Sequence, residues 1–289
     1  VPGQHLGGMD NVHGTGWTSA ALMATTSGIP FSFPMSDATE VGVSTQFAPA
    51  LETLGTVLQQ KGYRQEFLCG SNASFGGRRT YFQQHGDYEI YDYPVALQNG
   101  DIPPGYQVWW GLEDAKLYDI AKKQLLELSA SGEPFNLTLL TVDTHFPDGY
   151  LCQLCEQGKY PVPLASIVEC ADRQATEFVQ WCQKQSFYED TVIVIMGDHP
   201  RMDTLLVDGV PLSDRRVYAC FLNAQIPQDM PDPSQRQYTH MDLFPTILAS
   251  MGFTIQGDRL GLGTNLFSQV PTLEEQFGLQ WLDDQLQKT

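Results

Sequence analysis

Two segments of the chain place an aspartate and a histidine directly after a strongly apolar run. Ile193–Met196 leads into Asp198 and His199, and a second apolar run leads into Asp143 and His145. In open α/β sheets, ligands bind beyond the carboxyl ends of the strands, so both pairs lie where a site is expected. Carboxylate and imidazole groups together suit a divalent metal ion. The alternatives are that Asp198 caps the next element and that His145 is a loop histidine bonded to backbone.

A glycine-rich turn forms the next candidate. Gly14–Trp17 leads into a helix that begins near Thr18, in the run GTGWTSAALMA. The free N–H groups and the positive dipole end of such a helix suit a phosphate or sulfate group. Thr18 is either the N-cap of this helix or a hydroxyl that takes part in chemistry. The turn lacks the Gly-Lys-Ser/Thr ending of a P-loop, and no Cys or Ser opens the motif of a formylglycine sulfatase.

The segment Asn72–Arg79 is a glycine-rich loop with two adjacent arginines, Arg78 and Arg79, in a chain that has only 16 lysines and arginines. Arginine is suited to bidentate contact with phosphate. A solvated loop is the alternative. Cys69 and Gly70 fit the end of a strand, so the loop is expected at the same edge of the sheet as the other candidates.

The composition excludes several classes of protein. The 289 residues are 42% hydrophobic and 17% charged, enough to bury a core, which excludes intrinsic disorder. Lys and Arg total 16 against 34 Asp and Glu, a formal charge of −18, so no nucleic-acid partner is expected. No run approaches the roughly 20 apolar residues of a membrane span. An anionic substrate therefore needs a locally positive pocket, made by a metal ion or a few arginines.

A sheet is needed to bring these residues together. Short, nearly continuous apolar runs predict buried strands over 63–69, 135–142, 191–196 and 216–222. Helices are expected over 51–61, 114–131, 166–185, 242–251 and 272–289. This alternation predicts an α/β fold, a doubly wound and mostly parallel sheet flanked by helices, in one domain over residues 1–289. The irregular segment 88–110 is expected to be a long surface loop.

Six cysteines leave two interpretations open. Cys152, Cys155 and Cys170 lie in a stretch interrupted by prolines, where a disulfide would stabilise a soft segment. A disulfide in an oxidising compartment is favoured, with the pairing among these three and Cys182 undetermined. Zinc is the rival, because Cys152 and Cys155 have C-x-x-C spacing, but no second C-x-x-C or histidine pair follows.

Taken together, these segments resemble one family. The sequence is similar to the osmoregulated periplasmic glucan phosphoglycerol transferases, in the lipoteichoic acid synthase-like family of the alkaline phosphatase/sulfatase superfamily. The run TVDTHFPDG is typical of the glucan-type branch, whereas the Thr and Asp-His motifs occur across the superfamily. The segments that carry the resemblance are Gly14–Pro30, Asn72–Arg79, Trp110–Asp114, Leu139–Gly149, Thr191–His199 and Leu260–Gly263.

The resemblance implies roles for individual residues. Thr18 matches the family's nucleophile, and Asp198 and His199 match two ligands of a single divalent metal ion that Thr18 also contacts. His145 matches a histidine beside the bound phosphoglycerol group, and Arg78 matches a basic residue that contacts its phosphate or glycerol. In the run WGLED, two further residues are expected to bind substrate, Trp110 and Asp114.

The resemblance also implies an activity and its setting. It implies an enzyme that moves phosphoglycerol from phosphatidylglycerol to a periplasmic glucan hydroxyl, through a threonine-linked intermediate, at the periplasmic face of the bacterial inner membrane. The implied cofactor is one divalent ion, Mn²⁺ ahead of Mg²⁺ or Zn²⁺, because the ligands are oxygen and nitrogen. The family has a fourth metal ligand, a glutamate, and a membrane anchor upstream. We expect this sequence to be an N-terminally shortened catalytic domain without them.

Other functions remain open at this point. A phosphoethanolamine transferase uses the same kind of nucleophile but carries more metal-binding histidines, for which His240 is the spare candidate. A phosphodiesterase or phosphatase would pass the group to water. A metal-poor module that binds glucan or a lipid head group is the non-enzymatic alternative. The family's aromatic position beside the arginine holds Gly76 here.

Overall fold

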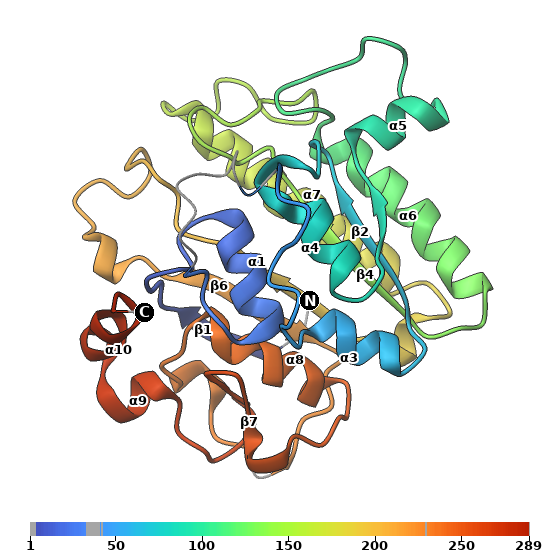
Figure 1. The fold of residues 1–289 in the computed structure, drawn as a ribbon. Coiled ribbons are helices and arrows are strands. Elements are labelled where there is room, and N and C mark those ends of the chain that lie inside the picture. The colour runs from blue at the N-terminus through green and yellow to red at the C-terminus, as the bar shows by residue number, and fades with distance from the viewer. Residues whose placement is uncertain (1–3, 33–40, 42, 229, 289) are drawn as a thin grey trace.

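A computed structural model of the chain describes residues 4–32, 41, 43–228 and 230–288. Its strands are β1 (Gln4–Met9), β2 (Arg64–Cys69), β3 (Glu89–Tyr91), β4 (Phe135–Leu140), β5 (Ile193–Met196), β6 (Val217–Leu222), β7 (Arg259–Leu260) and β8 (Gly263–Thr264). Its α-helices are α1 (Thr18–Ser27), α3 (Leu54–Gln60), α4 (Arg78–Gln84), α5 (Tyr93–Asn99), α6 (Asp114–Ala130), α7 (Pro163–Cys182), α8 (Leu243–Ser250), α9 (Leu273–Phe277) and α10 (Leu279–Leu286). Short 3-10 helices include η1 (Phe75–Gly77) and η5 (His240–Asp242). Figure 1 shows α1 near the middle of the molecule.

The strands form sheets of two kinds. β2 lies between β3 and β4, and both pairings are parallel. β6 lies between β1 and β5, and both pairings are antiparallel. Parallel neighbours need a crossover, which α4, α5 and α6 provide, whereas no α-helix lies between β5 and β6. The expected α/β class is confirmed, but among the strands described, parallel neighbours occur only in β3-β2-β4, apart from an isolated parallel bridge between Asp10 and Thr239.

Most expected elements are present with shifted ends. All four expected strands form, and the helix expected over 272–289 is divided into α9 and α10 at Gly278, whose φ is 84°. The expectation of a long loop over 88–110 is wrong, because β3 and α5 lie there. Helix α5 begins where the Asp92 side chain accepts the Val95 N–H at 3.3 Å, and it ends at Gly100 in the left-handed conformation.

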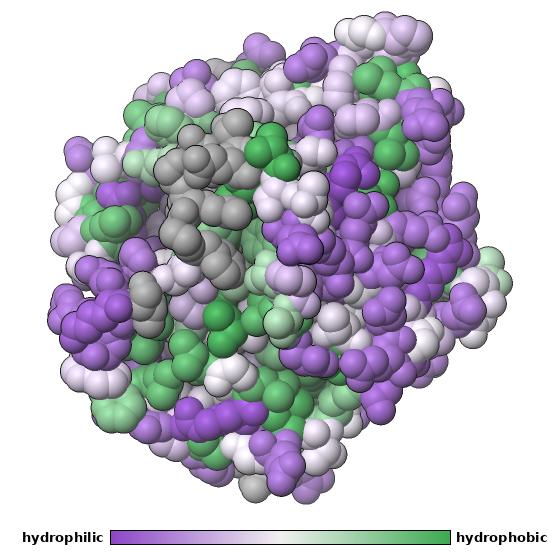
Figure 2. Space-filling view, in the orientation of Figure 1, coloured by the Kyte–Doolittle hydropathy of each residue, from purple (hydrophilic) through white to green (hydrophobic). Residues whose placement is uncertain are grey.

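Buried apolar side chains fix the layers that carry the site. Helix α1 is buried along most of its length and packs against α8 and η5. Beside it, the rings of Phe67 on β2 and Phe82 on α4 stack with centroids 4.1 Å apart. On the outside, Figure 2 shows mainly hydrophilic side chains on the right flank, where α3 and α6 lie. Among the described helices, none has the length and apolar character needed to cross a membrane.

Candidate active site

Thr18 is the first residue of α1, and its hydroxyl is turned away from a capping role. The N-cap is Trp17, with an extended backbone and no side-chain cap hydrogen bond. The Thr18 hydroxyl instead donates to Asp198 Oδ2 at 2.9 Å, across 180 residues of sequence. The first N–H groups of an α-helix have no partner within the helix, so the start of α1 offers donors beside this hydroxyl. The capping interpretation of Thr18 therefore does not hold.

Asp198 and His199 follow β5 and meet at one carboxylate oxygen. His199 Nε2 lies 3.4 Å from Asp198 Oδ2, and the His199 main-chain N–H donates to Asp198 Oδ1 at 2.9 Å. His199 Nδ1 lies 2.9 Å from the Pro200 carbonyl oxygen, which can only accept, so Nδ1 donates to it. Nε2 is therefore the ring atom that faces Asp198 Oδ2, the oxygen to which Thr18 donates. It is the atom with which His199 could bind a metal ion.

His240 supports Asp198 from behind. It lies in η5, is fully buried, and its Nε2 donates to the Asp198 main-chain oxygen at 2.5 Å. Burial lowers the pKa of His240 to about 4, so the ring is neutral at physiological pH. Its Nδ1 has no hydrogen-bond partner among the described residues. We call Thr18, Asp198, His199 and His240 the Asp198 group.

The two adjacent arginines have different tasks. Arg79 forms an ion pair of 2.6 Å with Asp92, the residue that caps α5, so it holds the fold. Arg78 is 7% exposed, and its Nε and Nη2 donate within their own loop, to Phe75 O, Ser71 Oγ and Asn72 O. No bond involves its Nη1 in the described part of the chain. Burial lowers the pKa of the Arg78 guanidinium, and the negative charge of Asp198 acts in the opposite direction and raises it.

Trp110 and His145, two of the expected substrate contacts, lie among aromatic rings. Trp110 packs edge-on against His145, with centroids 5.3 Å apart, and lies 6.1 Å from Phe75. The main-chain N–H of Val108 donates to the carbonyl oxygen of Gly111, and the N–H of Gly111 donates to that of Val108, both at 2.8 Å. Trp109 and Trp110 between them therefore form a tight turn, in which Trp109 has a φ of 50°. Trp110 remains 43% exposed and Phe75 53%. We call Phe75, Arg78, Trp110 and His145 the His145 group.

Asp114 lies beneath this group rather than in it. It is 2% exposed, and its two carboxylate oxygens accept the main-chain N–H groups of Val142 and Asp143 at 2.7 and 3.1 Å. Asp143 Oδ1 in return accepts the Asp114 N–H at 3.2 Å. Burial raises the pKa of Asp114 to about 6 and that of Asp143 to about 8, and the two charges repel. In this arrangement the Asp114 carboxylate orients the loop that carries His145.

Arg201 is a residue that the sequence analysis missed. Its guanidinium donates to the main-chain oxygens of Thr144 and Pro147, on either side of His145, and to Asp203 Oδ2 at 2.8 Å. It therefore ties the loop of His145 to the segment that follows His199. An arginine two residues after an Asp-His pair, in an acidic chain, was the available sequence signal.

The Asp198 group has the donors that a divalent ion requires. Oxygen and nitrogen ligands bind such ions at about 2.1 Å, which places adjacent ligands about 3 Å apart. Thr18 Oγ1 and His199 Nε2 lie 2.9 and 3.4 Å from Asp198 Oδ2, close to that spacing. The three residues therefore fit a metal ion.

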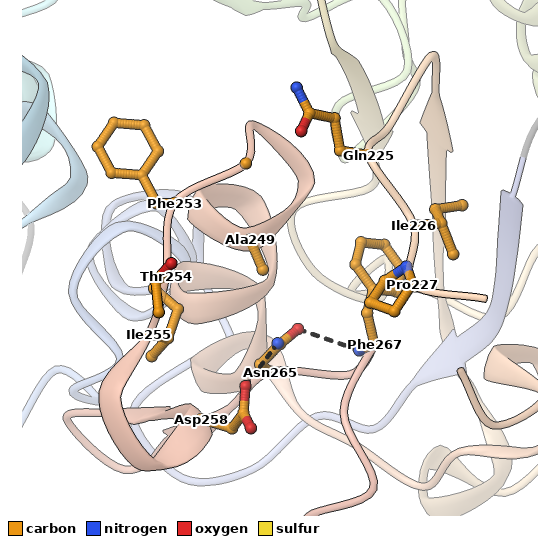
Figure 3. Close-up of a pocket in the computed structure, with 11 residues that line it drawn as sticks. Gln225, Ile226, Pro227, Ala249, Phe253, Thr254, Ile255, Asp258, Asn265 and Phe267 are labelled. Carbon is orange, nitrogen blue, oxygen red and sulfur yellow. Dashed lines mark hydrogen bonds between the residues drawn. The ribbon is translucent and has the colours of Figure 1, made fainter. Parts of the chain in front are cut away.

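A pocket of about 450 Å³ lies elsewhere, between the segment after β6 and the segment after α8. Figure 3 shows Asn265 at its floor, which donates to Asp258 at 2.9 Å and accepts from the Phe267 N–H at 3.0 Å. None of the expected site residues lines it. Because the Asp258 carboxylate already has a partner and the pocket contains none of the candidate nucleophile, histidine or metal-ligand positions, this pocket is not the candidate active site.

Comparison with known proteins finds a matching family model and curated relatives. The model of the family described as Sulfatase matches residues 9–253. "Phosphoglycerol transferase I" of Xanthomonas campestris pv. campestris (strain B100) is 33% identical over 224 residues, which is 76% of this chain and 32% of that protein. The protein of the same name from Salmonella choleraesuis is 32% identical over 261 residues, 88% of this chain and 33% of that protein. The chain thus spans about a third of the length of these curated relatives.

Solved structures show the same fold. A protein in the alkaline phosphatase superfamily from Vibrio parahaemolyticus has a TM-score of 0.69 at 22% identity, over 94% of this chain and 63% of that one. The lipoteichoic acid synthase LtaP from Listeria monocytogenes has a TM-score of 0.69 at 19% identity, over 90% of this chain and 67% of that one. Streptococcus pyogenes phosphoglycerol transferase GacH, solved with sn-glycerol-1-phosphate, has a TM-score of 0.52 at 14% identity, over 86% and 65%.

Proposed function

The chain belongs to the sulfatase family, and on that premise we propose that it transfers phosphoglycerol from phosphatidylglycerol to a hydroxyl of a periplasmic glucan. The observation that carries the proposal is the Thr18 hydroxyl, at the start of α1 and 2.9 Å from Asp198 Oδ2. The names of the curated relatives support phosphoglycerol as the transferred group. Because the proposed donor is a membrane lipid and the proposed acceptor is a periplasmic glucan, we place the reaction at the periplasmic face of the bacterial inner membrane.

In the first half-reaction, Thr18 Oγ gives its proton to Asp198 Oδ2, which already accepts its hydrogen bond, and attacks phosphorus to form a phosphodiester, while the bond from phosphorus to diacylglycerol breaks. N–H groups at the start of α1 and the Nη1 of Arg78 contact the phosphoryl oxygens. His145, in its protonated form, gives its proton to the departing diacylglycerol oxygen. The product is a glycerophospho-threonine.

In the second half-reaction, neutral His145 takes the proton of the glucan hydroxyl, which attacks phosphorus and displaces Thr18. The exposed ring of Trp110, 5.3 Å from His145, offers a flat surface for a sugar of the acceptor. Asp198 returns the proton to Thr18 Oγ as it leaves, and His145 is again protonated, so atoms and protons balance over the cycle.

Thr18, Asp198 and His199 hold one divalent metal ion in this proposal, with Mn²⁺ as the ion used. When bound, such an ion lowers the pKa of a hydroxyl ligand and neutralises charge on phosphoryl oxygens. Asp198 also accepts a hydrogen bond from the Thr18 hydroxyl, which orients Oγ before substrate binds. His240 fixes the Asp198 backbone and so the direction of its carboxylate.

The test measures diacylglycerol release from phosphatidylglycerol with Mn²⁺, with and without a β-glucan. We expect release that glucan stimulates, with glycerol phosphate appearing on the sugar. Release that glucan leaves unchanged would identify a hydrolase instead, and no release with retained glucan binding would identify a binding module. Phosphatidylethanolamine serves as the matched donor, and preference for it would indicate a phosphoethanolamine transferase.

A further inference from the structure

A second cluster of reactive side chains lies where the loop after β4 packs on α7. Cys152 and Cys155 come from the loop and Cys170 comes from the helix, and all three are buried, with exposed fractions of 1%, 8% and 1%. Cys152 Sγ lies 3.5 Å from Cys155 Sγ and 3.9 Å from Cys170 Sγ. All three sulfur atoms lie within 4.8 Å of one another. Cys182 is twelve residues further along the helix, about 18 Å at 1.5 Å per residue, and so lies outside the cluster.

The sulfur spacing matches a metal site better than a disulfide. Zinc binds thiolate sulfur at about 2.3 Å, so two sulfurs on a tetrahedral ion lie about 3.8 Å apart. The two measured separations, 3.5 and 3.9 Å, bracket that value. A disulfide requires sulfurs about 2.05 Å apart and would use two of the three. A disulfide would therefore leave the third cysteine as a buried thiol packed against the S–S bond, with no bonding partner of its own.

The surroundings of the cluster suit thiolates. Arg173 Nη2 lies 3.5 Å from Cys170 Sγ, so an N–H group points at the sulfur, and the side-chain amide of Gln174 ends 3.3 Å from the same atom. Gln174 is 6% exposed, and its Oε1 has no hydrogen-bond partner among the described residues. A half-turn of the amide exchanges its two end atoms and brings that oxygen to the cluster. The guanidinium of Arg173 offsets the net charge of −1 that three thiolates and a divalent ion would have.

We propose that Cys152, Cys155 and Cys170 bind one zinc-class ion, with Gln174 Oε1 as the fourth ligand. Binding forms three sulfur–metal bonds and releases three thiol protons to solvent. Burial raises the pKa of Cys152 and of Cys155, because desolvation disfavours the thiolate form. The ion is separate from the one in the Asp198 group, and this proposal does not depend on the proposed transfer reaction.

The site would hold the loop of His145 on α7. A chain of main-chain hydrogen bonds connects the two, from Gly149 N to His145 O at 2.9 Å and from Tyr150 N to Asp143 O at 2.7 Å. Cys152 N then donates to Tyr150 O at 3.0 Å. Because the ion joins Cys152 and Cys155 to Cys170, losing it frees the loop that presents His145.

The test uses the full chain with Asp198→Asn and His199→Ala, which removes the other metal site. We expect this protein to retain about one zinc per chain. Replacement of zinc by cobalt should give thiolate-to-cobalt charge-transfer absorption, which oxygen and nitrogen ligands do not produce. Cys170→Ser should lose both, whereas the matched control Cys182→Ser, on the same helix, should keep both.

A milder variant guards against misfolding of the cysteine variants. Gln174→Leu keeps all three sulfurs and should weaken zinc binding about 10-fold in competition with a chelator. A reduced chain that retains no zinc, or a crosslinked peptide pair that joins Cys170 to Cys152 or Cys155 in the protein as purified, would overturn the proposal. The second result would establish the disulfide that the sequence favours.

Discussion

The two groups of the candidate active site are held together in different ways. In the Asp198 group, Thr18 and His199 converge on one carboxylate oxygen at 2.9 and 3.4 Å, over a buried His240. In the His145 group, the side chains meet through rings with centroids 5.3 and 6.1 Å apart, and two of those rings are about half exposed. Short polar contacts hold the reacting atoms of the Asp198 group in place, whereas the ring contacts of the His145 group form a surface that can adjust to a bound substrate. Variants of Thr18 and Asp198 should therefore abolish the reaction, and variants of the exposed rings Trp110 and Phe75 should weaken it by degrees.

Thr18→Ala should have the largest effect. Removing Oγ leaves no atom for the covalent step, so diacylglycerol release should fall at least about 1,000-fold. Thr18→Ser keeps a hydroxyl and should retain a measurable rate. The release rates of both variants are compared with that of the unchanged chain, after a Tm measurement has shown that all three proteins are equally stable. Turnover by the alanine variant near the starting rate would mean that the two groups do not divide the work in this way.

Arg201→Ala tests the connection between the groups. Without the guanidinium, the loop around His145 loses its bonds at Thr144 and Pro147 and shifts relative to Asp198. Displacement of a catalytic group by about 1 Å costs on the order of 100-fold in rate, so we expect a loss between about 10- and 100-fold. Hydrogen exchange at the amides of residues 144–146 should become faster. Unchanged exchange with a lost rate would show that Arg201 acts on substrate directly.

Trp110→Ala should have a smaller and different effect. Aromatic contacts contribute about 0.5–1.5 kcal/mol, so KM for the glucan should rise up to about 10-fold while kcat changes little. Trp110→Phe is the matched control, because it keeps a ring against His145 and should lie between the two. An equal loss in kcat would place Trp110 with the residues that fix reacting atoms.

Asp143→Asn should have the smallest effect, and that effect depends on pH. The pKa of Asp143 is raised to about 8 in the folded chain, above its unfolded value of about 3.9, so the folded state binds more protons. Its contribution to stability is therefore present at low pH and is lost as pH rises through 8. The variant should lose less stability between pH 6 and 8, by about 2 kcal/mol at most, or a few degrees in Tm.

Two other buried carboxyls titrate in this pH range, because burial raises the pKa of Glu66 to about 7 and that of Glu274 to about 8. They are present in both the variant and the unchanged chain, so their contributions cancel when the two stabilities are compared. Equal pH dependence of Tm for the variant and the unchanged chain would contradict the assigned shift at Asp143. That result would also remove the buried pair from the account of how the His145 loop is oriented.

The sequence predicted the positions that depend on local pattern. The strand before Asp198 is a continuous apolar run, and the helix after Thr18 follows a glycine-rich turn, so both were identified. The pattern also overestimated irregularity at 88–110, where Asp92 and Gly100 were available as helix boundaries. Local composition described that stretch poorly because caps, rather than apolar periodicity, define so short a helix.

Long-range contacts were beyond the sequence pattern. No spacing rule brings Arg201 to the carbonyls beside His145, or Cys170 to Cys152, because the intervening loops set those distances. Asp114 was expected among the substrate contacts, and its burial under the backbone of 142 and 143 follows from how α6 begins beside β4. Antiparallel pairing of β5 with β6 likewise depends on a connection that has no α-helix.

The most direct test of the account is to trap the covalent intermediate. The chain is mixed with phosphatidylglycerol and Mn²⁺ without a glucan, quenched in acid, and digested for mass spectrometry. The account predicts one phosphoglycerol group on the peptide that contains Thr18, and its loss when glucan is added before the quench. Transfer to glucan with no adduct at Thr18, or with the adduct on another residue, would contradict it.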